Sequence, residues 1–234
     1  MLFAKKRTKA FHSEMRALSG LLLEMGKLAE SQVGRIAEAL ATPGGQIARI
    51  EVERDAAIDS LQRAIDLRAV ETIARCGPAH ADLREVLSML RIAGQFERIG
   101  DLAKNIGKRL LAMSRDNHLP SPAHGLNGLA LAVLEQLQDV LDSLIHRDVA
   151  KAINVWTRDE DVDRLCAVLS RELMIRMAQD PRVITCGIHL LFCSKNLERM
   201  GDHATNIAEA VCYMIEGRRL DDRPKADVTS AVMT

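Results

Sequence analysis

An eleven-residue segment occurs twice in this chain and limits its possible folds more than any other feature. FERIGDLAKNI begins at Phe96 and LERMGDHATNI begins at Leu197, with seven identical positions at an offset of 101 residues. A second pair of segments, RDAAIDSL from Arg54 and RDEDVDRL from Arg158, repeats in the same order at an offset of 104 residues. Two signatures in one order at nearly one offset indicate a duplicated structural unit.

Apolar residues between the sequence breaks recur every three or four positions, which is typical of amphipathic helices. No strand-like alternation is present. The breaks are TPGG at Thr42–Gly45, CGP at Cys76–Pro78, DP at Asp180–Pro181 and the longer connector Asp116–Gly125. These patterns predict six long helices over residues 11–41, 47–75, 80–115, 125–146, 148–178 and 182–216. The break between the fourth and fifth helices, near Arg147–Asp148, carries the weakest signal.

The duplication and the helix count together predict an all-α protein of two tandem, pseudo-symmetric three-helix bundles. We expect the first bundle over residues 1–118, the second over residues 119–217 and a loose tail over residues 218–234. Only 3% of the residues are aromatic, so the core should consist of aliphatic side chains packed between helices.

Composition excludes several classes of protein. The 32 acidic and 32 basic residues balance, so no global charge favours nucleic-acid binding. No apolar stretch is long enough for a signal peptide or a membrane span, and the five cysteines form no CxxC pair. These features predict a cytoplasmic protein with reduced, mostly buried thiols. The basic start, with Lys5, Lys6, Arg7 and Lys9, is either a frayed terminus or a contact for an anionic surface.

Two pairs of acids four residues apart lie in each half of the chain. Residues at this spacing share one helix face. The acids of each half also lie at nearly equal distances from the hairpin turn between their helices, about 27 Å along each helix. We therefore expect four carboxylates to converge at one level of each bundle. The eight acids are Asp55, Asp59, Glu97, Asp101, Asp159, Asp163, Glu198 and Asp202.

Carboxylate groups in this arrangement favour a metal site. Hard oxygen ligands suit Mg²⁺, Mn²⁺, Ca²⁺ or iron, with zinc as a further candidate, and Asn105 and Asn206 would add neutral oxygens. Gly100 and Gly201 would allow another helix or a ligand to approach the backbone closely. Two alternatives stay open. The acids could form a surface neutralised by nearby basic residues, or a groove that receives a basic helix of a partner; the basic neighbours are Arg54, Arg98, Lys195 and Arg199.

Other candidate sites carry less weight. Cys186, His189 and Cys193 share a helix face, but that face is apolar and favours buried thiols. Trp156 is expected in the core or an interface, and His203 has Leu102 as its counterpart, so it lies outside the repeated pattern. No histidine follows a glutamate by three residues, as di-iron bundles require, and no nucleotide-binding or hydrolase motif occurs. The chain is therefore not expected to be an enzyme.

FERIGDLAKNIGKR and LERMGDHATNIAEAVCYMIEG, together with RDAAIDSL and RDEDVDRL, resemble the PhoU family of phosphate-transport regulators. The resemblance extends from Phe11 to about Gly217. It implies a fold of two three-helix bundles. It also implies that the eight acids correspond to family motifs that hold metal clusters in some members.

The resemblance further implies a regulatory role. PhoU-like proteins act between the phosphate ABC transporter, with its ATPase subunit, and a phosphate-sensing histidine kinase, and they keep phosphate-starvation genes silent. The expected protein is thus a negative regulator of phosphate uptake, a homodimer, and close to the membrane only through its partners. A helical adaptor, scaffold or metal-binding protein without a link to phosphate is the alternative.

Overall fold

A computed structural model describes the backbone of residues 2–41, 46–113 and 123–220, and the side chains of residues 10–41, 56–113 and 125–220. These residues form helices and no strand. The helices are α1 (Leu2–Ala41), α2 (Gln46–Cys76), α3 (His80–Met113), α4 (Ala123–His146), α5 (Val149–Thr157), α6 (Asp159–Gln179) and α7 (Ile184–Glu216), with a 3-10 turn, η1, at Pro181–Val183.

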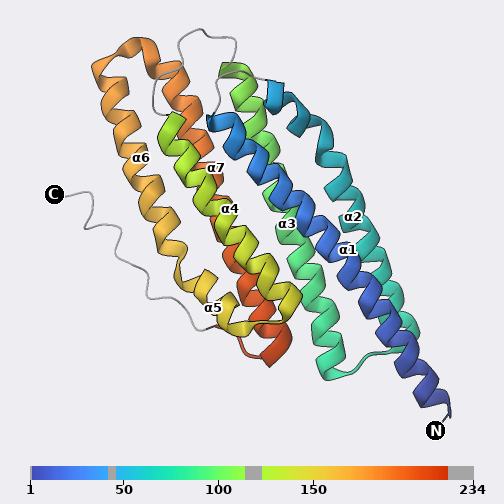
Figure 1. The fold of residues 1–234 in the computed structure, drawn as a ribbon. Helices are drawn as coiled ribbons and strands as arrows, with labels where there is room; N and C mark the ends of the chain where they lie inside the picture. The colour runs from blue at the N-terminus through green and yellow to red at the C-terminus, as the bar shows by residue number, and fades with distance from the viewer. Residues whose placement is uncertain (1, 42–45, 114–122, 221–234) are drawn as a thin grey trace.

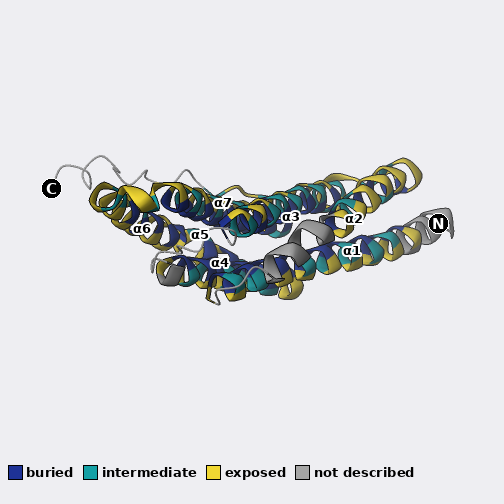
Figure 2. Ribbon diagram, turned by 90° about the horizontal axis from the view of Figure 1, so that it is seen from above, coloured by how far each residue is buried: buried dark blue, intermediate teal, exposed yellow. Residues whose placement is uncertain are grey.

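The helices form two layers (Figures 1 and 2). One layer contains α6, α7, α3 and α2 in that order, and the second contains α4 and α1. Helices α1 to α3 form one bundle and α4 to α7 form its pseudo-symmetric counterpart, with their hairpin turns at opposite ends of the molecule. The predicted all-α fold of two tandem bundles is confirmed.

The two bundles share one hydrophobic core. Helices α3 and α7 pack along each other at the centre, and α1 and α4 cover them. Apolar side chains from both halves, among them Phe96, Ile106, Leu137 and Leu197, belong to one cluster of buried residues. Burial of this apolar surface, rather than helix propensity, stabilises the long helices.

The predicted helix over residues 148–178 is wrong in one respect, because it is interrupted at Arg158. The amide of Arg158 closes α5 on the carbonyl of Asn154, and the carbonyl of Arg158 accepts from the amide of Asp161 in α6. The guanidinium of Arg158 also pairs with Glu135 of α4 at 3.0 Å. These contacts stabilise an interruption of the helix that the apolar periodicity does not predict. Asp159 is therefore the first residue of α6.

The ends of other elements agree with the predicted breaks. Arg147, between α4 and α5, has a left-handed backbone with φ of 53°, and Asp148 caps α5 by accepting from the amide of Lys151. Gly217 ends α7 with φ of 74°, a conformation that favours glycine. Helix α1 begins at Leu2, earlier than predicted, whereas the side chains of Lys5, Lys6, Arg7 and Lys9 lie outside the described residues.

Two further features bear on the predictions made from composition. Within the described ranges, no helix combines the length and apolar character that a bilayer span requires. Of the predicted tail, only residues 218–220 are described, and Leu220 packs against the core.

All five cysteines are buried, and none forms a disulfide: Cys76, Cys166, Cys186, Cys193 and Cys212. This confirms the expected burial of the thiols on the apolar face of α7. The thiol of Cys186 lies 3.5 Å from the sulfur of Met113. Burial raises the pKa of the Cys193 thiol to about 12 and that of Cys212 to about 11.

We predict that the native thiols react slowly with Ellman's reagent at pH 8, because all five are buried from the reagent. The raised pKa of Cys193 and Cys212 also leaves these two thiols with little thiolate. All five should react at once in denaturant, and absorbance of the released thionitrobenzoate measures both rates. A thiol that reacts within seconds in the native protein would contradict this expectation.

Gly26 marks the closest approach at the centre of the fold. A Cβ atom on Gly26 of α1 would lie 2.3 Å from Leu141 of α4 and 3.0 Å from the ring of Phe96 of α3. A Cβ atom on Gly20, two turns earlier in α1, would meet nothing within 4 Å. The packing therefore leaves no room for a side chain at Gly26, whereas Gly20 has room for one.

We predict opposite effects for the same substitution at these positions. Gly26→Ala should lower the free energy of unfolding by about 1 kcal/mol or more, because the buried methyl group overpacks the core. Gly20→Ala should raise it by about 0.4–1 kcal/mol, because it only restricts the unfolded chain. Urea titration of both variants checks this pair, and a stabilised Gly26→Ala protein would refute the close packing.

Candidate functional site

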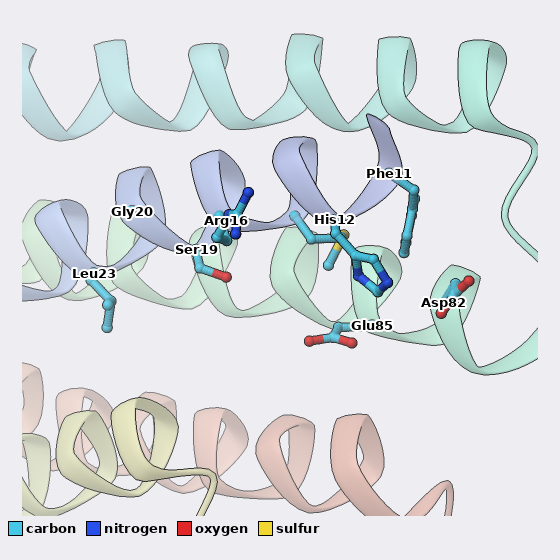
Figure 3. Close-up of a pocket in the computed structure, with 9 residues that line it drawn as sticks. Phe11, His12, Arg16, Ser19, Gly20, Leu23, Asp82 and Glu85 are labelled. Atoms are coloured by element: carbon cyan, nitrogen blue, oxygen red, sulfur yellow. The ribbon is translucent and has the colours of Figure 1, made fainter. Parts of the chain in front are cut away.

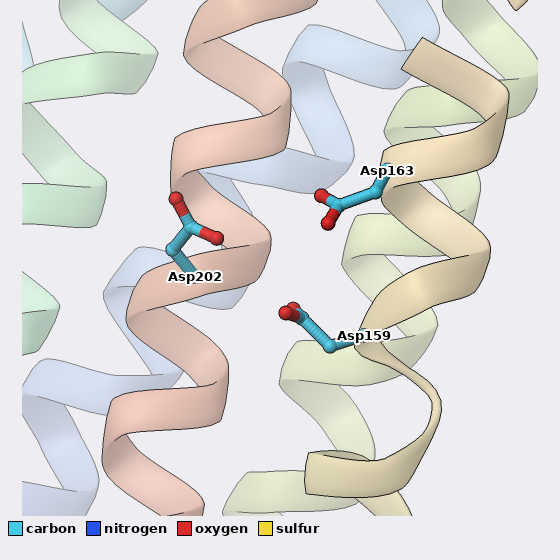
Figure 4. A group of neighbouring side chains, drawn as sticks. All are labelled: Asp159, Asp163 and Asp202. Atoms are coloured by element: carbon cyan, nitrogen blue, oxygen red, sulfur yellow. The ribbon is translucent and has the colours of Figure 1, made fainter. Parts of the chain in front are cut away.

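Three of the predicted acids of the second half lie together between α6 and α7. Asp159, Asp163 and Asp202 each present a carboxylate oxygen, and these oxygens lie within 4.8 Å of one another (Figure 4). We call these three residues the acidic triad. Asp159 is buried, whereas Asp163 and Asp202 are exposed. The predicted convergence from the two arms of a hairpin is confirmed for these three residues.

The buried member of the triad is held from the inner side. The hydroxyl of Thr205 on α7 lies 2.8 Å from Oδ1 of Asp159 and 3.0 Å from the carbonyl oxygen of Gly201, and either oxygen can accept its one hydrogen. The side-chain amide of Gln136 on α4 in turn donates to the Thr205 hydroxyl at 3.5 Å. These polar contacts reach Asp159 from α7 and, through Thr205, from α4. Sequence reasoning selected neither Thr205 nor Gln136.

Glu198 does not belong to the triad, which corrects the prediction of four converging acids. Its carboxylate pairs with the ammonium group of Lys195, one turn earlier on α7, at 2.6 Å. The first-half counterpart of Lys195 is Gly94, which has no side chain to form such a pair. A basic neighbour thus neutralises this glutamate, as the alternative of a salt-bridged surface predicted.

In the first half, Asp59 of α2 and Glu97 and Asp101 of α3 interact electrostatically, and we call them the first acidic cluster. Among the described residues, only the acidic triad brings three such oxygens within 4.8 Å of one another. Partial burial raises the pKa of Glu97, and the charges of Asp101 and then Asp59 raise it further. Arg98, 3.6 Å from Glu97, partly offsets their repulsion. The side chain of Asp55 lies outside the described residues.

The repeated glycines fix the same packing in both halves. A Cβ atom on Gly100 would lie 3.0 Å from Ile58 of α2 and 3.2 Å from Oε1 of Gln32 of α1. A Cβ atom on Gly201 would lie 3.2 Å from Val162 of α6 and 3.1 Å from Oε1 of Gln136. The close helix approach expected at these glycines is confirmed.

The contacting residues are themselves repeated. Gln32 and Gln136, like Ile58 and Val162, are 104 residues apart, the offset already seen for the acids of α2 and α6. Both glutamines are buried, and their Oε1 atoms have no hydrogen-bond partner among the described residues. Extending the repeat to the first helix of each half would have identified them from the sequence.

Asn206 lies away from the triad, contrary to the expectation that it adds a ligand. Its side-chain amide donates to Oε1 of Gln95 on α3 at 3.3 Å, and Nδ1 of His203 lies 2.8 Å from the same oxygen. Burial lowers the pKa of His203, and the positive charges of Arg199 and Arg98 lower it further. These residues therefore join the two bundles.

Trp156 serves packing, as predicted. It is partly buried against the core, and its indole nitrogen donates to Glu209 of α7 at 3.1 Å.

A separate pocket opens between the first part of α1 and the start of α3 (Figure 3). Its lining combines apolar side chains such as Phe11 with the ionisable residues His12, Arg16, Asp82 and Glu85. The basic groups come from α1 and the acidic groups from α3, so the chemistry of the pocket differs from that of the acidic triad. No feature of the sequence predicted it.

The donor set of the triad suits a hard cation. Three carboxylates from two helices provide the oxygen ligands that Mg²⁺, Mn²⁺, Ca²⁺ and iron prefer, and no thiol lies among them. Without a counter-charge, carboxylates at this separation repel one another. A bound cation would remove that repulsion and link the two helices.

Comparison with known proteins identifies a matching protein family and several similar proteins. The family model described as the PhoU domain matches twice, over residues 22–110 and 126–211. A phosphate-specific transport system accessory protein PhoU homolog of Rhizobium meliloti is 42% identical over 95% of this chain and 94% of its own length. One from Caulobacter vibrioides is 41% identical over 95% of this chain and 97% of its own.

Solved structures agree with this relationship. The crystal structure of PhoU from Pseudomonas aeruginosa superposes with a TM-score of 0.86 at 33% identity, covering 89% of this chain and 100% of that one. The phosphate transport system regulatory protein PhoU from Streptococcus pneumoniae gives a TM-score of 0.82 at 29% identity over 91% of this chain and 100% of its own. Two domain matches and relatives aligned over nearly their whole length show that this chain belongs to the PhoU family.

Proposed function

We propose that this protein is a negative regulator of phosphate uptake and of the phosphate-starvation response. The observation that carries the proposal is the name shared by its relatives, phosphate-specific transport system accessory protein, at about 40% identity over nearly the whole chain. It acts by binding other proteins rather than by catalysis. Its proposed partners are the ATPase subunit of the phosphate ABC transporter and a phosphate-sensing histidine kinase, met in the cytoplasm, and it acts as a homodimer.

The second part of the proposal concerns the acids. The acids of each half form a site for Mg²⁺, Mn²⁺, iron or zinc ions. In the first half these are Asp55, Asp59, Glu97 and Asp101; in the second they are the acidic triad, with Glu198 one turn before Asp202 on α7. The supporting observation is the acidic triad, whose oxygens come within 4.8 Å from two helices. A bound cation supplies positive charge between the second and third helices of a bundle. The protein's own part is to hold the carboxylates in place, through Thr205 in the case of Asp159.

Cation binding at these sites would affect regulation by making the pair of helices that carries the acids more rigid. Asp163 and Asp202 are exposed, so the triad lies at the surface that a partner can contact. Linking α6 to α7 restricts their relative motion and fixes the shape of that surface. Preorganisation of this kind lowers the entropic cost of binding a partner.

We predict that deleting the gene activates phosphate-starvation genes in phosphate-rich medium, because the regulator that silences them is lost. A transcriptional reporter of one such gene measures the effect, and a plasmid copy of the wild-type gene should restore silence. A reporter that stays silent in the deletion strain would overturn the regulatory role.

We predict that Asp159→Asn/Asp202→Asn removes the cation of the second site. Elemental analysis should show lower metal content. At a Mn²⁺ concentration one hundred times the Kd, the wild-type site should add about 2.7 kcal/mol to the free energy of unfolding, a gain that the variant should lose. Asp55→Asn/Asp101→Asn is the equivalent change in the first half.

Glu160→Gln/Asp161→Asn is the matched control, because it removes two exposed acids of α6 outside the triad. The control should keep the metal content and the stabilisation of the wild type. Equal metal content and equal melting temperature in wild type and Asp159→Asn/Asp202→Asn would refute metal binding, and the reporter experiment would be unaffected.

A further inference from the structure

We infer that the groove between the first part of α1 and the start of α3 is an interface between two copies of this chain, and that each copy occupies the groove of the other. The inference rests on the homodimer of the proposed function and names the surface that forms it. Three observations carry it: the course of the groove, the opposite charges of its two walls, and the direction in which the two helices run.

The groove consists of two adjoining pockets along α1. They share Ser19 and Leu23 and together extend from Phe11 to Leu23, about 18 Å along the helix. The smaller pocket is bounded partly by the end of α4, whereas the larger one is lined by α1 and α3 alone. The volume of the larger pocket, about 880 Å³, compares with about 30 Å³ for one water molecule. The groove therefore continues past the end of α4 and can admit several side chains of a second molecule.

Apolar side chains form the base of the groove. Phe11 and Met15 of α1 are nearly buried, and Leu23 is half-buried. Ile145, at the end of α4, lines the smaller pocket and is still 47% exposed. A second chain in the groove would remove this remaining apolar surface from water, which is the main favourable contribution to protein association.

The two walls of the groove carry opposite charges (Figure 3). His12 and Arg16 are exposed and lie one turn apart on the same face of α1. Asp82 and Glu85 lie on the α3 side of the groove. Glu85 already pairs with Arg147, which follows α4, at 2.5 Å. Arg16 and Asp82 are therefore the charges that each wall offers to a second molecule.

The fold pairs other charges of α1 but not this one. Glu14, which faces α2, pairs with Arg68 at 2.9 Å. Within the ranges of the chain that the structure describes, neither Arg16 nor Asp82 forms an ion pair. Both side chains belong to exposed residues. A second molecule can thus pair with them without breaking an ion pair that already exists.

These charges select one direction for a two-fold axis. Helices α1 and α3 both run upward from the same end of the molecule (Figure 1), so the residues of the two walls lie at matching heights. An axis along the groove places α1 of each copy on α3 of the other, which pairs Arg16 with Asp82 twice. An axis across the groove would place α1 on α1 and bring like charges together. The groove is therefore self-complementary about the axis that runs along it.

Charge reversal in the full-length protein tests this inference. The wild type should be a dimer at micromolar concentration in sedimentation equilibrium. Arg16→Glu and Asp82→Arg should each raise the dimer Kd at least about tenfold, because each change creates two like-charged contacts in a symmetric interface.

An equimolar mixture of the two variants gives the sharpest result. In the mixed dimer, one contact keeps Arg16 against Asp82, and the other pairs the introduced glutamate with the introduced arginine. The mixture should therefore dimerise about as tightly as the wild type, and so should the double variant Arg16→Glu/Asp82→Arg. Recovery in the mixture also shows that each variant is folded.

Lys27→Glu is the matched control, because it reverses an exposed charge of α1 that does not line the groove. It should leave the dimer Kd unchanged. A monomeric wild type would overturn the inference, and so would a dimer that survives both single reversals, which would place the homodimer on another surface. Failure of the mixture to dimerise would overturn it as well. The reporter experiment on the deletion strain tests the regulatory role separately, so the two failures can be told apart.

Discussion

Close approach of three helices at one glycine is the constraint on which both acidic sites depend. At Gly100 and at Gly201 the absence of a side chain lets an aliphatic residue of the second helix and a buried glutamine of the first reach the third helix. Glycine in a helix interior costs about 1 kcal/mol relative to alanine, and this packing offsets the cost. Because the second acid of each motif follows the glycine directly, the height and direction of its carboxylate are fixed by the same contact.

The shared core adds a second constraint. Helices α3 and α7 carry the repeated motifs, and they also form the contact between the bundles. Gln95, His203 and Asn206 join these helices through one side-chain oxygen. The residues around a site therefore serve two purposes: one face of α7 holds the acids against α6, and another holds the bundles together.

Much of this arrangement could be predicted from the sequence, because duplication and helical periodicity are long-range signals that average over many residues. The helix ends at Gly77–Pro78 and Asp180–Pro181 allowed the levels of the acids to be counted, and Asp159, Asp163 and Asp202 meet as that count requires. The break at Arg158 escaped prediction because it depends on a tertiary ion pair with Glu135 and on no helix-breaking residue. The separation of Glu198 from the triad also escaped prediction. Counting residues gives the height of a side chain along the helix, but it does not show that Glu198 pairs with Lys195 on its own helix.

The layered arrangement has a consequence for recognition. Helices α2, α3, α7 and α6 lie side by side in one layer, while α1 and α4 cover its inner side (Figure 2). Asp163 and Asp202 are on the outer side, with α4 behind them (Figure 4). Under the proposed function, a partner broad enough to span this layer would contact both halves of the chain at once, and two linked contacts strengthen each other through effective concentration. The duplication thus gives a single chain the geometry of a bivalent ligand.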